Sequence, residues 1–500
     1  MEDKLHELKT RLATIMDLLM AANVLDWDQE TYMPPGGAQA RGDQVATLQE
    51  LAHRFITDDA VGRLLDDLAA YEAELDYDSD EAALIRVTRR EYNRRTKVPP
   101  TLVAEYYRTK ALATEAWKEA RQKSDFRIFE PLLEKMVEIR HQWAECFKPY
   151  SNIYDPLIDE YEPGMTSAQI EAVFSGLKPH LVELVQAIVA HQDAVDDSPL
   201  HGDFDPEAQM AFGREVVEKL GYDFSRGRLD LSAHPFTIHF ARYDVRITTR
   251  IMRDFLPSCL MGIIHEGGHA LYEQNTSPAY YRTPLAFGAS MATHESQSRF
   301  YENVIGRSRP FWKHFYPRLQ EMFPQLKGVS LEAFYRALNK SQPSLIRVEA
   351  DEVTYGLHIM LRFELEDAIL NGKVRVADLP REWNGRMEAY LGLVPPNDSL
   401  GVLQDIHWSQ GYIGYFPDYL LGSIFSVQLW EQMQQDIPDV TEQIEAGKFD
   451  AILAWNTEHI YQHGMKYTLP ELAERVTGRP LTWEPYMSYL RTKYGEIYGL

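Results

Sequence analysis

Helical periodicity is the feature that most limits how this chain can fold. Apolar residues recur every three or four positions through most of the sequence, beginning with Leu5, Leu8, Leu12, Ile15 and Leu19. This spacing gathers apolar side chains on one helix face, as in helices that share a core. No internal repeat and no clear linker interrupts the pattern. The sequence therefore predicts a mainly α fold, with residues 1–500 forming one large helical body of two lobes.

Breaks and caps in the pattern give some of the helix boundaries. The Met-Pro-Pro-Gly-Gly segment at 33–37 ends the first helix, and a second is expected over about residues 38–54. Thr166 and Asp205 each precede an apolar helical pattern and are expected to cap its first turn. The helix after Asp205 is expected to stop at Gly221.

One stretch alternates in the manner of β-strands. Residues 236–240 and 243–248 are rich in β-branched and aromatic residues, and Ala241 and Arg242 lie between them. We expect a short hairpin here, with Asp244 and Arg246 bracing it as a structural pair. Its edge could hold an extended peptide as an added strand.

Charge and cysteine content exclude several classes of function. The formal net charge of −24 works against binding nucleic acid or an anionic membrane. The two cysteines exclude a disulfide framework. The charged start, Met1-Glu2-Asp3-Lys4, is not followed by an apolar signal region. We expect a soluble, cytoplasmic protein with neither nucleic-acid nor membrane partners.

The most informative segment is His265-Glu266-Gly267-Gly268-His269, an H-E-x-x-H motif inside an apolar helical pattern. Residues four apart lie on one face of a helix, so the two histidines can bind one metal ion. Glu266 is placed to hold a water at the metal and take its proton. Two glycines in a helix interior are unfavourable, and they indicate either close approach of a substrate or strand, or tight helix packing.

A catalytic zinc site needs a third protein ligand. Residues 292–300 read as a second helix after a loop near Ser277 and Pro278. Both His294 and Glu295 lie on it, and their side chains point about 100° apart, so only one can face the ion. Glu295 is our candidate, and the spacing alone leaves His294 as an open alternative.

The chain resembles the thermostable metallocarboxypeptidases of bacteria and archaea, the carboxypeptidase Taq type. Six motifs support the resemblance, in the family's order between His234 and Trp408. They are His234-Pro235-Phe236; the D-x-R-x-T of Asp244, Arg246 and Thr248; His265 to His269; His294-Glu295-Ser296-Gln297; Ile346-Arg347 with Ala350-Asp351; and the G-x-x-Q-D-x-H-W of Gly401, Gln404, Asp405, His407 and Trp408.

The resemblance implies a nearly all-helical fold with a deep substrate groove and a small antiparallel β-sheet beside the metal. We expect the helices of about residues 1–75 to cover that groove. The resemblance favours Glu295 as third ligand and implies zinc, with cobalt or manganese as substitutes. It also implies a homodimer that releases single C-terminal amino acids from peptides with broad specificity.

Recognition of a free C-terminal carboxylate calls for a fixed cation, and Arg347 is the candidate. The alternative is that Arg347 forms a helix ion pair with Asp351, four residues away. Tyr415 and Tyr419 are candidates for contacting the oxyanion or the carboxylate, unless they only pack at a helix start. His234 and His407 lie inside motifs, and we expect them near the substrate without assigning either a role.

Two other functions compete with this interpretation. An endo-acting metallo-oligopeptidase of short peptides is the nearest, and it would not need Arg347 to meet a terminal carboxylate. A non-catalytic protein with a helical groove would be expected to have a damaged site. Both histidines, Glu266 and Glu295 are all present, which favours the enzyme.

Overall fold

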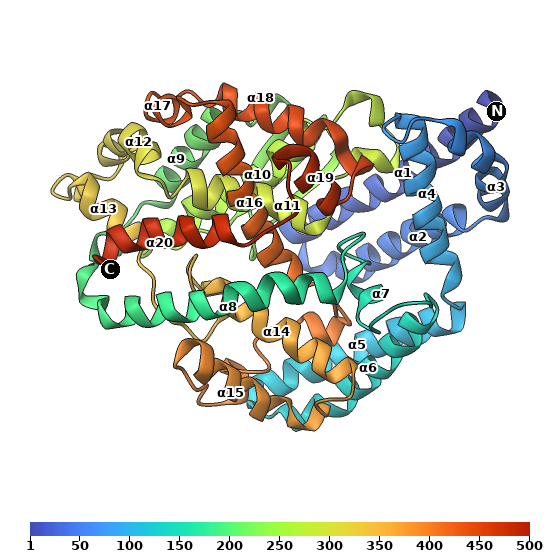
Figure 1. The fold of residues 1–500 in the computed structure, drawn as a ribbon, viewed down its shortest axis with the longest axis horizontal. Helices are drawn as coiled ribbons and strands as arrows, with labels where there is room; N and C mark the ends of the chain where they lie inside the picture. The colour runs from blue at the N-terminus through green and yellow to red at the C-terminus, as the bar shows by residue number, and fades with distance from the viewer. The chain divides into compact units, whose positions relative to one another are not determined.

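Helices make up most of the chain, and its one sheet has three strands, so the predicted mainly α fold is confirmed (Figure 1). The computed structural model describes all residues from Met1 to Leu500. The chain divides into two compact units. Unit 1 comprises Met1–Thr96, Asp197–Leu338 and Leu429–Gly478, and unit 2 comprises Lys97–Asp196, Asn339–Gln428 and Arg479–Leu500.

The elements of unit 1 are α1 (Glu2–Thr31), α2 (Ala38–Ile56), α3 (Asp59–Glu74), α4 (Asp80–Lys97), α9 (Pro206–Lys219), β1 (Gly227–Leu231), β2 (Thr237–Ala241), β3 (Asp244–Thr249), α10 (Leu256–Gln274), α11 (Met291–Arg299), α12 (Arg309–Met322), α13 (Leu331–Leu338), α17 (Val440–Glu445), α18 (Asp450–His459) and α19 (Leu469–Thr477). Those of unit 2 are α5 (Pro100–Lys123), α6 (Glu130–Glu145), α7 (Asp155–Ile158), α8 (Ser167–Ala190), α14 (Tyr355–Leu370), α15 (Leu379–Leu391) and α20 (Glu484–Tyr498). Helix α16 (Pro417–Asp436) begins in unit 2 and ends in unit 1.

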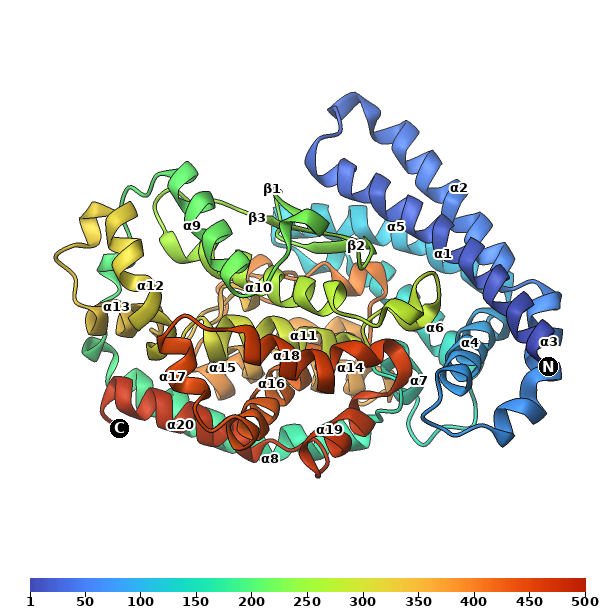
Figure 2. The ribbon, with the colours of Figure 1, turned by 90° about the horizontal axis from the view of Figure 1, so that it is seen from above.

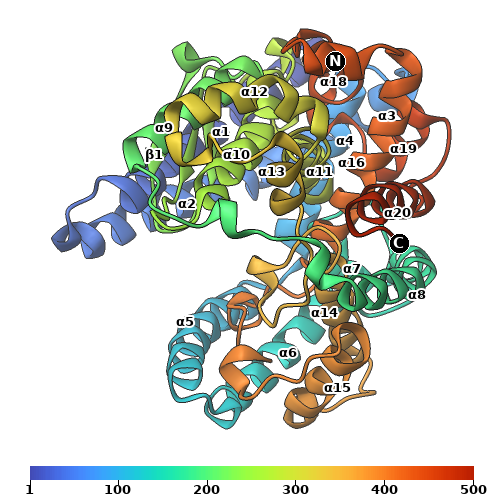
Figure 3. The same ribbon diagram turned by 90° about the vertical axis from the view of Figure 1, so that its left-hand side faces the viewer.

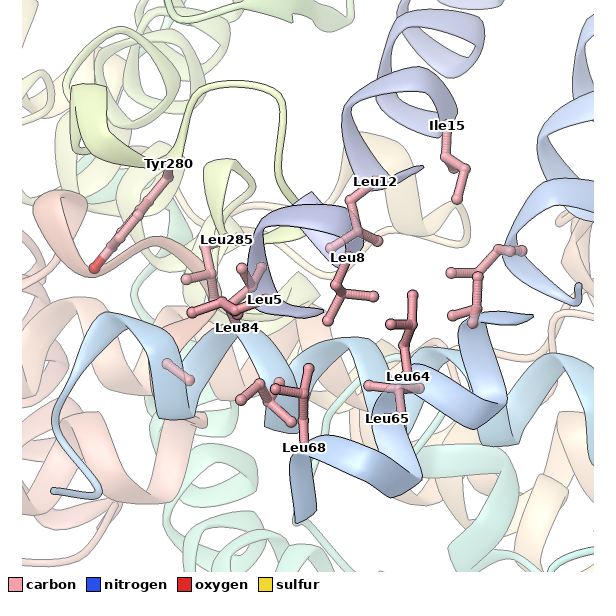
Figure 4. Close-up of a cluster of buried hydrophobic side chains, with 14 of the residues drawn as sticks. Leu5, Leu8, Leu12, Ile15, Leu64, Leu65, Leu68, Leu84, Tyr280 and Leu285 are labelled. Atoms are coloured by element: carbon pink, nitrogen blue, oxygen red, sulfur yellow. The ribbon is translucent and has the colours of Figure 1, made fainter. Parts of the chain in front are cut away.

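The N-terminal helices bury the apolar stripe that the sequence predicts. Leu5, Leu8, Leu12 and Ile15 of α1 are buried. They pack in one cluster with side chains of α3, α4 and the segment after α10, as Figure 4 shows for Leu64, Leu65, Leu68, Leu84, Tyr280 and Leu285. Helix α1 ends at Thr31, just before the Pro-Pro-Gly-Gly segment, and α2 runs alongside it (Figure 2). The half-buried Leu19 continues the same face.

The predicted caps form. Thr166 accepts a hydrogen bond from the backbone N–H of Gln169, whose side chain returns to the Thr166 N–H. Asp205 accepts from the N–H of Ala208, and after α9 the chain turns at Gly221, whose φ is +111°. Satisfying these free N–H groups stabilises the first turn of α8 and of α9.

Helices are the only regular secondary structure of unit 2. Its α5, α6, α14 and α15 gather together in Figure 3. By length and composition alone, α8 is apolar enough to cross a membrane. It packs against α14, α15 and α20, as core helices of globular proteins do.

The predicted hairpin is present, but the sheet is mixed rather than antiparallel. Strands β2 and β3 pair antiparallel, with Thr237 opposite Ile247, and Arg246 makes both of its bonds to Asp244. Strand β1 joins the other side of β3 in parallel, which gives the order β1-β3-β2. The sheet lies beside α10, so the hairpin stands next to the H-E-x-x-H helix (Figure 2).

Candidate metal centre and anion site

Two helices of unit 1 bring the predicted ligands together. His265 and His269 lie one turn apart on α10, and Glu295 comes from α11. Glu295 Oε2 lies 3.7 Å from His265 Nε2 and 3.5 Å from His269 Nε2. These residues form the one group of three or more histidine, cysteine, aspartate or glutamate side chains whose ligand atoms all lie within 4.8 Å of one another.

Close packing at Gly268 fixes the distance between the two helices. A Cβ on Gly268 would lie 2.5 Å from the carbonyl oxygen of Gln297 and 2.8 Å from Cα of Ser298, both on α11. A Cβ on Gly267 would meet Val217 of α9 at 2.5 Å. Of the two readings of these glycines, tight helix packing is therefore confirmed.

Basic and hydroxyl groups hold the Glu295 carboxylate. Arg299 Nε donates to Oε1 at 2.6 Å, and Ser298 Oγ donates to Oε2 at 2.9 Å. Burial alone would raise the pKa of Glu295, but Arg299 and His265 outweigh it and hold the pKa well below its usual range. The carboxylate is therefore charged and preformed as a metal ligand.

Glu302 supports the first histidine. It lies in a π-helical turn, Phe300–Ile305, which follows α11 directly, and its Oε2 is 2.9 Å from His265 Nδ1. Arg299 Nη1 also donates to this oxygen, at 3.3 Å. Despite burial, these contacts lower the pKa of Glu302 to about 2, so it accepts from His265 as a carboxylate. Such a partner fixes the ring so that Nε2 faces the centre.

His294, the alternative third ligand, faces away from the centre. Its Nδ1 is 2.6 Å from Nδ1 of His269, and its Nε2 is 2.7 Å from Oε1 of Glu273. The choice between His294 and Glu295 is thus made by the rotation of α11 against α10. His294 instead contacts the candidate ligand His269 at Nδ1, the ring nitrogen that does not face the centre.

Glu266 lies beside the triad and is anchored by the hairpin. Its Oε2 accepts a hydrogen bond from Thr237 Oγ1 of β2 at 2.7 Å. Burial raises its pKa, and nearby His265 and the Thr237 bond oppose that effect. A buried carboxylate next to a pair of imidazoles is suited to exchange a proton with a reacting water.

The donor set fits a zinc ion. Ligands bound tetrahedrally at about 2.0–2.2 Å stand roughly 3.3–3.5 Å apart, close to the two His–Glu separations above. Two imidazoles and one carboxylate are a usual set for catalytic zinc, and they leave a coordination position for water. Burial lowers the pKa of His269 to about 4. At His265 the carboxylates of Glu295 and Glu302 outweigh burial and raise the pKa, so this histidine must release a proton when it binds the ion.

A separate buried cluster, in unit 2, contains Arg347. The alternative prediction, a helix ion pair between Arg347 and Asp351, is wrong. Residues 347–349 form one short 3₁₀ turn and Ala350 is extended, so Arg347 and Asp351 do not share a helix. Asp351 instead accepts from Ser341 and Thr354. The partner of Arg347 is Asp405, whose Oδ1 accepts from Nε at 3.0 Å and Nη2 at 2.9 Å.

Asp405 is shared between two arginines. Its Oδ2 accepts from Arg362 Nε at 2.7 Å, and Asp405 is the only carboxylate paired with either guanidinium. Despite burial, Arg362 and Arg347 hold the pKa of Asp405 far below its usual value, so it is charged. Two positive charges and one negative charge leave a net charge of +1 in the cluster. Arg347 and Arg362 are only 6% and 0% exposed.

Arg347 keeps donors for a ligand. A guanidinium has five N–H groups. Asp405 takes two, and the Tyr355 hydroxyl accepts one from Nη1 at 3.2 Å. One N–H on each Nη atom is left, and a guanidinium can bind a carboxylate through two of its N–H groups.

Three more of the predicted substrate residues surround Arg347 in unit 2, and the fourth belongs to unit 1. The Tyr419 ring lies 5.0 Å from the Arg347 guanidinium, and its hydroxyl is 3.5 Å from His407 Nε2. Tyr415 stacks at a tilt on His407, with centroids 5.5 Å apart. Burial lowers the pKa of His407 to about 4, so it is neutral. His234 lies in unit 1, exposed, at the bend before β2.

Several residues of both clusters were missed by the sequence analysis. Arg299 and Glu302 follow Glu295 at i+4 and i+7, so their helical spacing was a usable signal. Thr237, Glu273 and the pairing of Asp405 with Arg347 had no such signal, because their partners lie far away in the sequence.

Known proteins match this chain along almost its whole length. The family model of the carboxypeptidase Taq (M32) metallopeptidases matches residues 7–494. Carboxypeptidase 1 of Bacillus subtilis is 39% identical over 481 residues, which are 96% of this chain and 96% of that protein. Thermostable carboxypeptidase 1 of Thermus thermophilus is 39% identical over 482 residues, 95% of this chain and 94% of that protein.

A solved structure agrees with both sequence matches. The M32 carboxypeptidase of Deinococcus radiodurans superposes with a TM-score of 0.96 at 39% identity, covering 100% of each chain. The motifs, the fold and the convergence of His265, His269 and Glu295 point the same way. The chain therefore belongs to the carboxypeptidase Taq (M32) family and is a metallocarboxypeptidase.

Proposed function

We propose that this chain is a zinc enzyme that hydrolyses the last peptide bond of a peptide and releases single amino acids with broad specificity. The observation that supports it most is the convergence of the partly buried His265 and His269 with the buried Glu295, with Glu266 beside them. When bound there, zinc would polarise the scissile carbonyl and lower the pKa of a water; cobalt or manganese would serve as substitutes.

Glu266 is the general base in this proposal. Its carboxylate takes a proton from the attacking water and later returns it to the leaving amine nitrogen. Thr237 holds one carboxylate oxygen through a 2.7 Å hydrogen bond, which aims the other toward the reacting atoms. The hairpin thus positions the base as well as bracing the sheet.

The C-terminal carboxylate of the substrate pairs with Arg347. The cluster's excess positive charge and the two remaining N–H groups on Arg347 support this assignment. We propose that Tyr415, Tyr419 and His407, which line the same cluster, contact the carboxylate or the oxyanion. His234 is proposed as a substrate contact from the bend before β2.

A peptide bound as an extra strand of the hairpin would use the outer edge of β2, because β3 is paired on both sides. The register turns the backbone groups of Thr237 and His239 away from β3. Asn23 of α1 already donates to the His239 carbonyl at 3.2 Å, so main-chain contacts are expected mainly at Thr237.

Replacing Glu266 by Gln tests the catalytic assignment. The Gln side chain keeps an oxygen for Thr237 and is nearly the same size, so the variant should fold and bind one zinc per chain. Loss of a general base lowers the rate by about 10² to 10⁴. Near-normal kcat with zinc bound would overturn the role of Glu266.

Replacing Arg347 by Met tests the substrate assignment separately. It leaves Asp405 paired with Arg362 and removes the excess charge, so we expect kcat/KM on peptides to fall about 30-fold or more through KM, as for loss of a buried charged partner. An unchanged KM would favour an endo-acting oligopeptidase. The homodimer stays a prediction, which light scattering on the purified chain would check, and so does the cytoplasmic location.

A further inference from the structure

The two histidines of the candidate metal centre have different partners at Nδ1, the ring nitrogen that does not face the centre. His265 Nδ1 meets the carboxylate of Glu302 directly, at 2.9 Å. His269 Nδ1 meets an imidazole instead, that of His294, at 2.6 Å. His294 is in turn held by Glu273, whose Oε1 lies 2.7 Å from Nε2. A carboxylate supports each ligand, but for His269 a second histidine stands between.

These distances fix where the protons lie when His269 binds a metal ion. His269 Nε2 must then present a lone pair, so its single ring proton is on Nδ1. That Nδ1–H donates to His294 Nδ1, which must be an acceptor. His294 therefore has its proton on Nε2 and donates it to Glu273. Each donor meets an acceptor, and no other arrangement leaves Nε2 of His269 free.

Glu273 is well placed to end this chain of hydrogen bonds. It lies on α10, one turn beyond His269, and is only 3% exposed. Its other oxygen, Oε2, is 3.3 Å from Nδ1 of His239 on β2. Glu273 thus stays in place with contacts on both sides.

We propose that His294 is a positioning residue for the metal centre: held by Glu273, it fixes the Nδ1–H tautomer and the ring orientation of His269, so that Nε2 faces Glu295. This proposal rests on the proposed zinc site. It assigns to the histidine next to Glu295 a function that does not involve binding the ion or the substrate.

Ring packing is the competing role for His294. Its ring stacks on Tyr272 with centroids 5.2 Å apart and planes at 27°, and Cδ2 lies close to Gly288. A residue needed only for packing would be replaced best by another flat ring. A residue needed as an acceptor would be replaced best by a side chain that places an acceptor where Nδ1 stands.

Two substitutions separate the roles. His294→Phe keeps a flat ring against Tyr272 and removes the acceptor. His294→Asn loses the ring but places Oδ1 the same number of bonds from Cα as Nδ1. Loss of such a supporting contact typically weakens metal affinity about 10- to 100-fold. The proposal predicts that fall for His294→Phe and an affinity within about threefold of wild type for His294→Asn. Packing predicts the reverse order.

The experiment measures the zinc dissociation constant of the full-length chain by competition with a chelator of known affinity, and the melting temperature of the metal-free protein. A His294→Phe variant that binds zinc like wild type would overturn the proposal. So would a folded His294→Asn variant that binds ten or more times more weakly. If His294→Phe does not fold, the Asn variant decides alone.

Zinc titration of the wild type distinguishes a failure of the proposed metal centre from a failure of the proposed role of His294. A wild-type chain that binds no zinc would overturn the proposed metal centre and this role with it. A wild-type chain that binds one zinc, with both variants unchanged, would leave the centre standing and overturn the role of His294 only.

Discussion

Asp405→Asn is the substitution that tests the charge arrangement in unit 2 most severely. In the wild type, one carboxylate accepts hydrogen bonds from both guanidiniums, on Oδ1 from Arg347 and on Oδ2 from Arg362. The asparagine is nearly isosteric but uncharged, and its NH₂ group replaces one of the two acceptor oxygens. Two buried positive charges then face each other without any anion.

The expected loss of stability follows from the number of buried charges that are left without a partner. Removing one partner of a buried ion pair costs about 3–5 kcal/mol, because an uncompensated charge stays behind. In Asp405→Asn two guanidiniums lose their partner, so we expect the upper part of that range. In Arg347→Met, Asp405 keeps Arg362 and the cluster becomes neutral, so the loss should stay below about 2 kcal/mol.

Urea unfolding of the wild type and both variants, followed by fluorescence at pH 7, measures these losses. We expect Asp405→Asn to be destabilised clearly more than Arg347→Met. If Arg347→Met costs as much or more, the cluster has no excess positive charge, and the reason for placing a substrate carboxylate at Arg347 fails.

Two further substitutions test the packing and the electrostatics elsewhere. Gly268→Ala should destabilise the protein by about 1–3 kcal/mol and weaken zinc binding, because its Cβ would press on the backbone of α11 at Gln297. Gly267→Ala is the control: it presses on α9, which supplies no ligand, so calorimetry should show lower stability and unchanged zinc affinity. In unit 2, burial raises the pKa of Glu366 to about 7. The folded state therefore holds a proton there that the unfolded chain, with a pKa of about 4.3, has released, and this contribution to stability is lost as pH rises toward 7. The stability of wild type relative to Glu366→Gln should thus fall by about 3 kcal/mol from pH 5 to pH 8 in urea titrations. A difference that is flat or rises would refute the raised pKa.

Local patterns were enough to predict several of the helices and most of the candidate metal centre. The stripe from Leu5 to Ile15 is a property of one helix, and the spacing of His265 and His269 places both on one face whatever surrounds them. The third ligand was different. His294 and Glu295 are neighbours, and only the rotation of α11 against α10, set where Gly268 meets the α11 backbone, decides which one faces the centre.

Contacts between distant segments could not be predicted. The i, i+4 spacing predicted an ion pair between Arg347 and Asp351, because it assumes that both residues lie on one continuous helix. The 3₁₀ turn ends before Ala350, which is extended, so the two residues do not share a helix. The true partner, Asp405, is 58 residues away. Strand β1 was not predicted for a related reason. The hairpin rules consider two strands that are neighbours in the sequence, whereas β1 pairs in parallel with β3, and β2 lies between them in the sequence.

The central claim is that this metallocarboxypeptidase removes residues one at a time from a free C-terminus. It is tested most directly by incubating the zinc-loaded chain with one mixed-sequence peptide, in free-acid and C-terminally amidated forms, and following the products by mass spectrometry. We predict stepwise loss of single residues from the free acid and no cleavage of the amide. Internal fragments from both peptides would contradict the claim and indicate an endo-acting oligopeptidase.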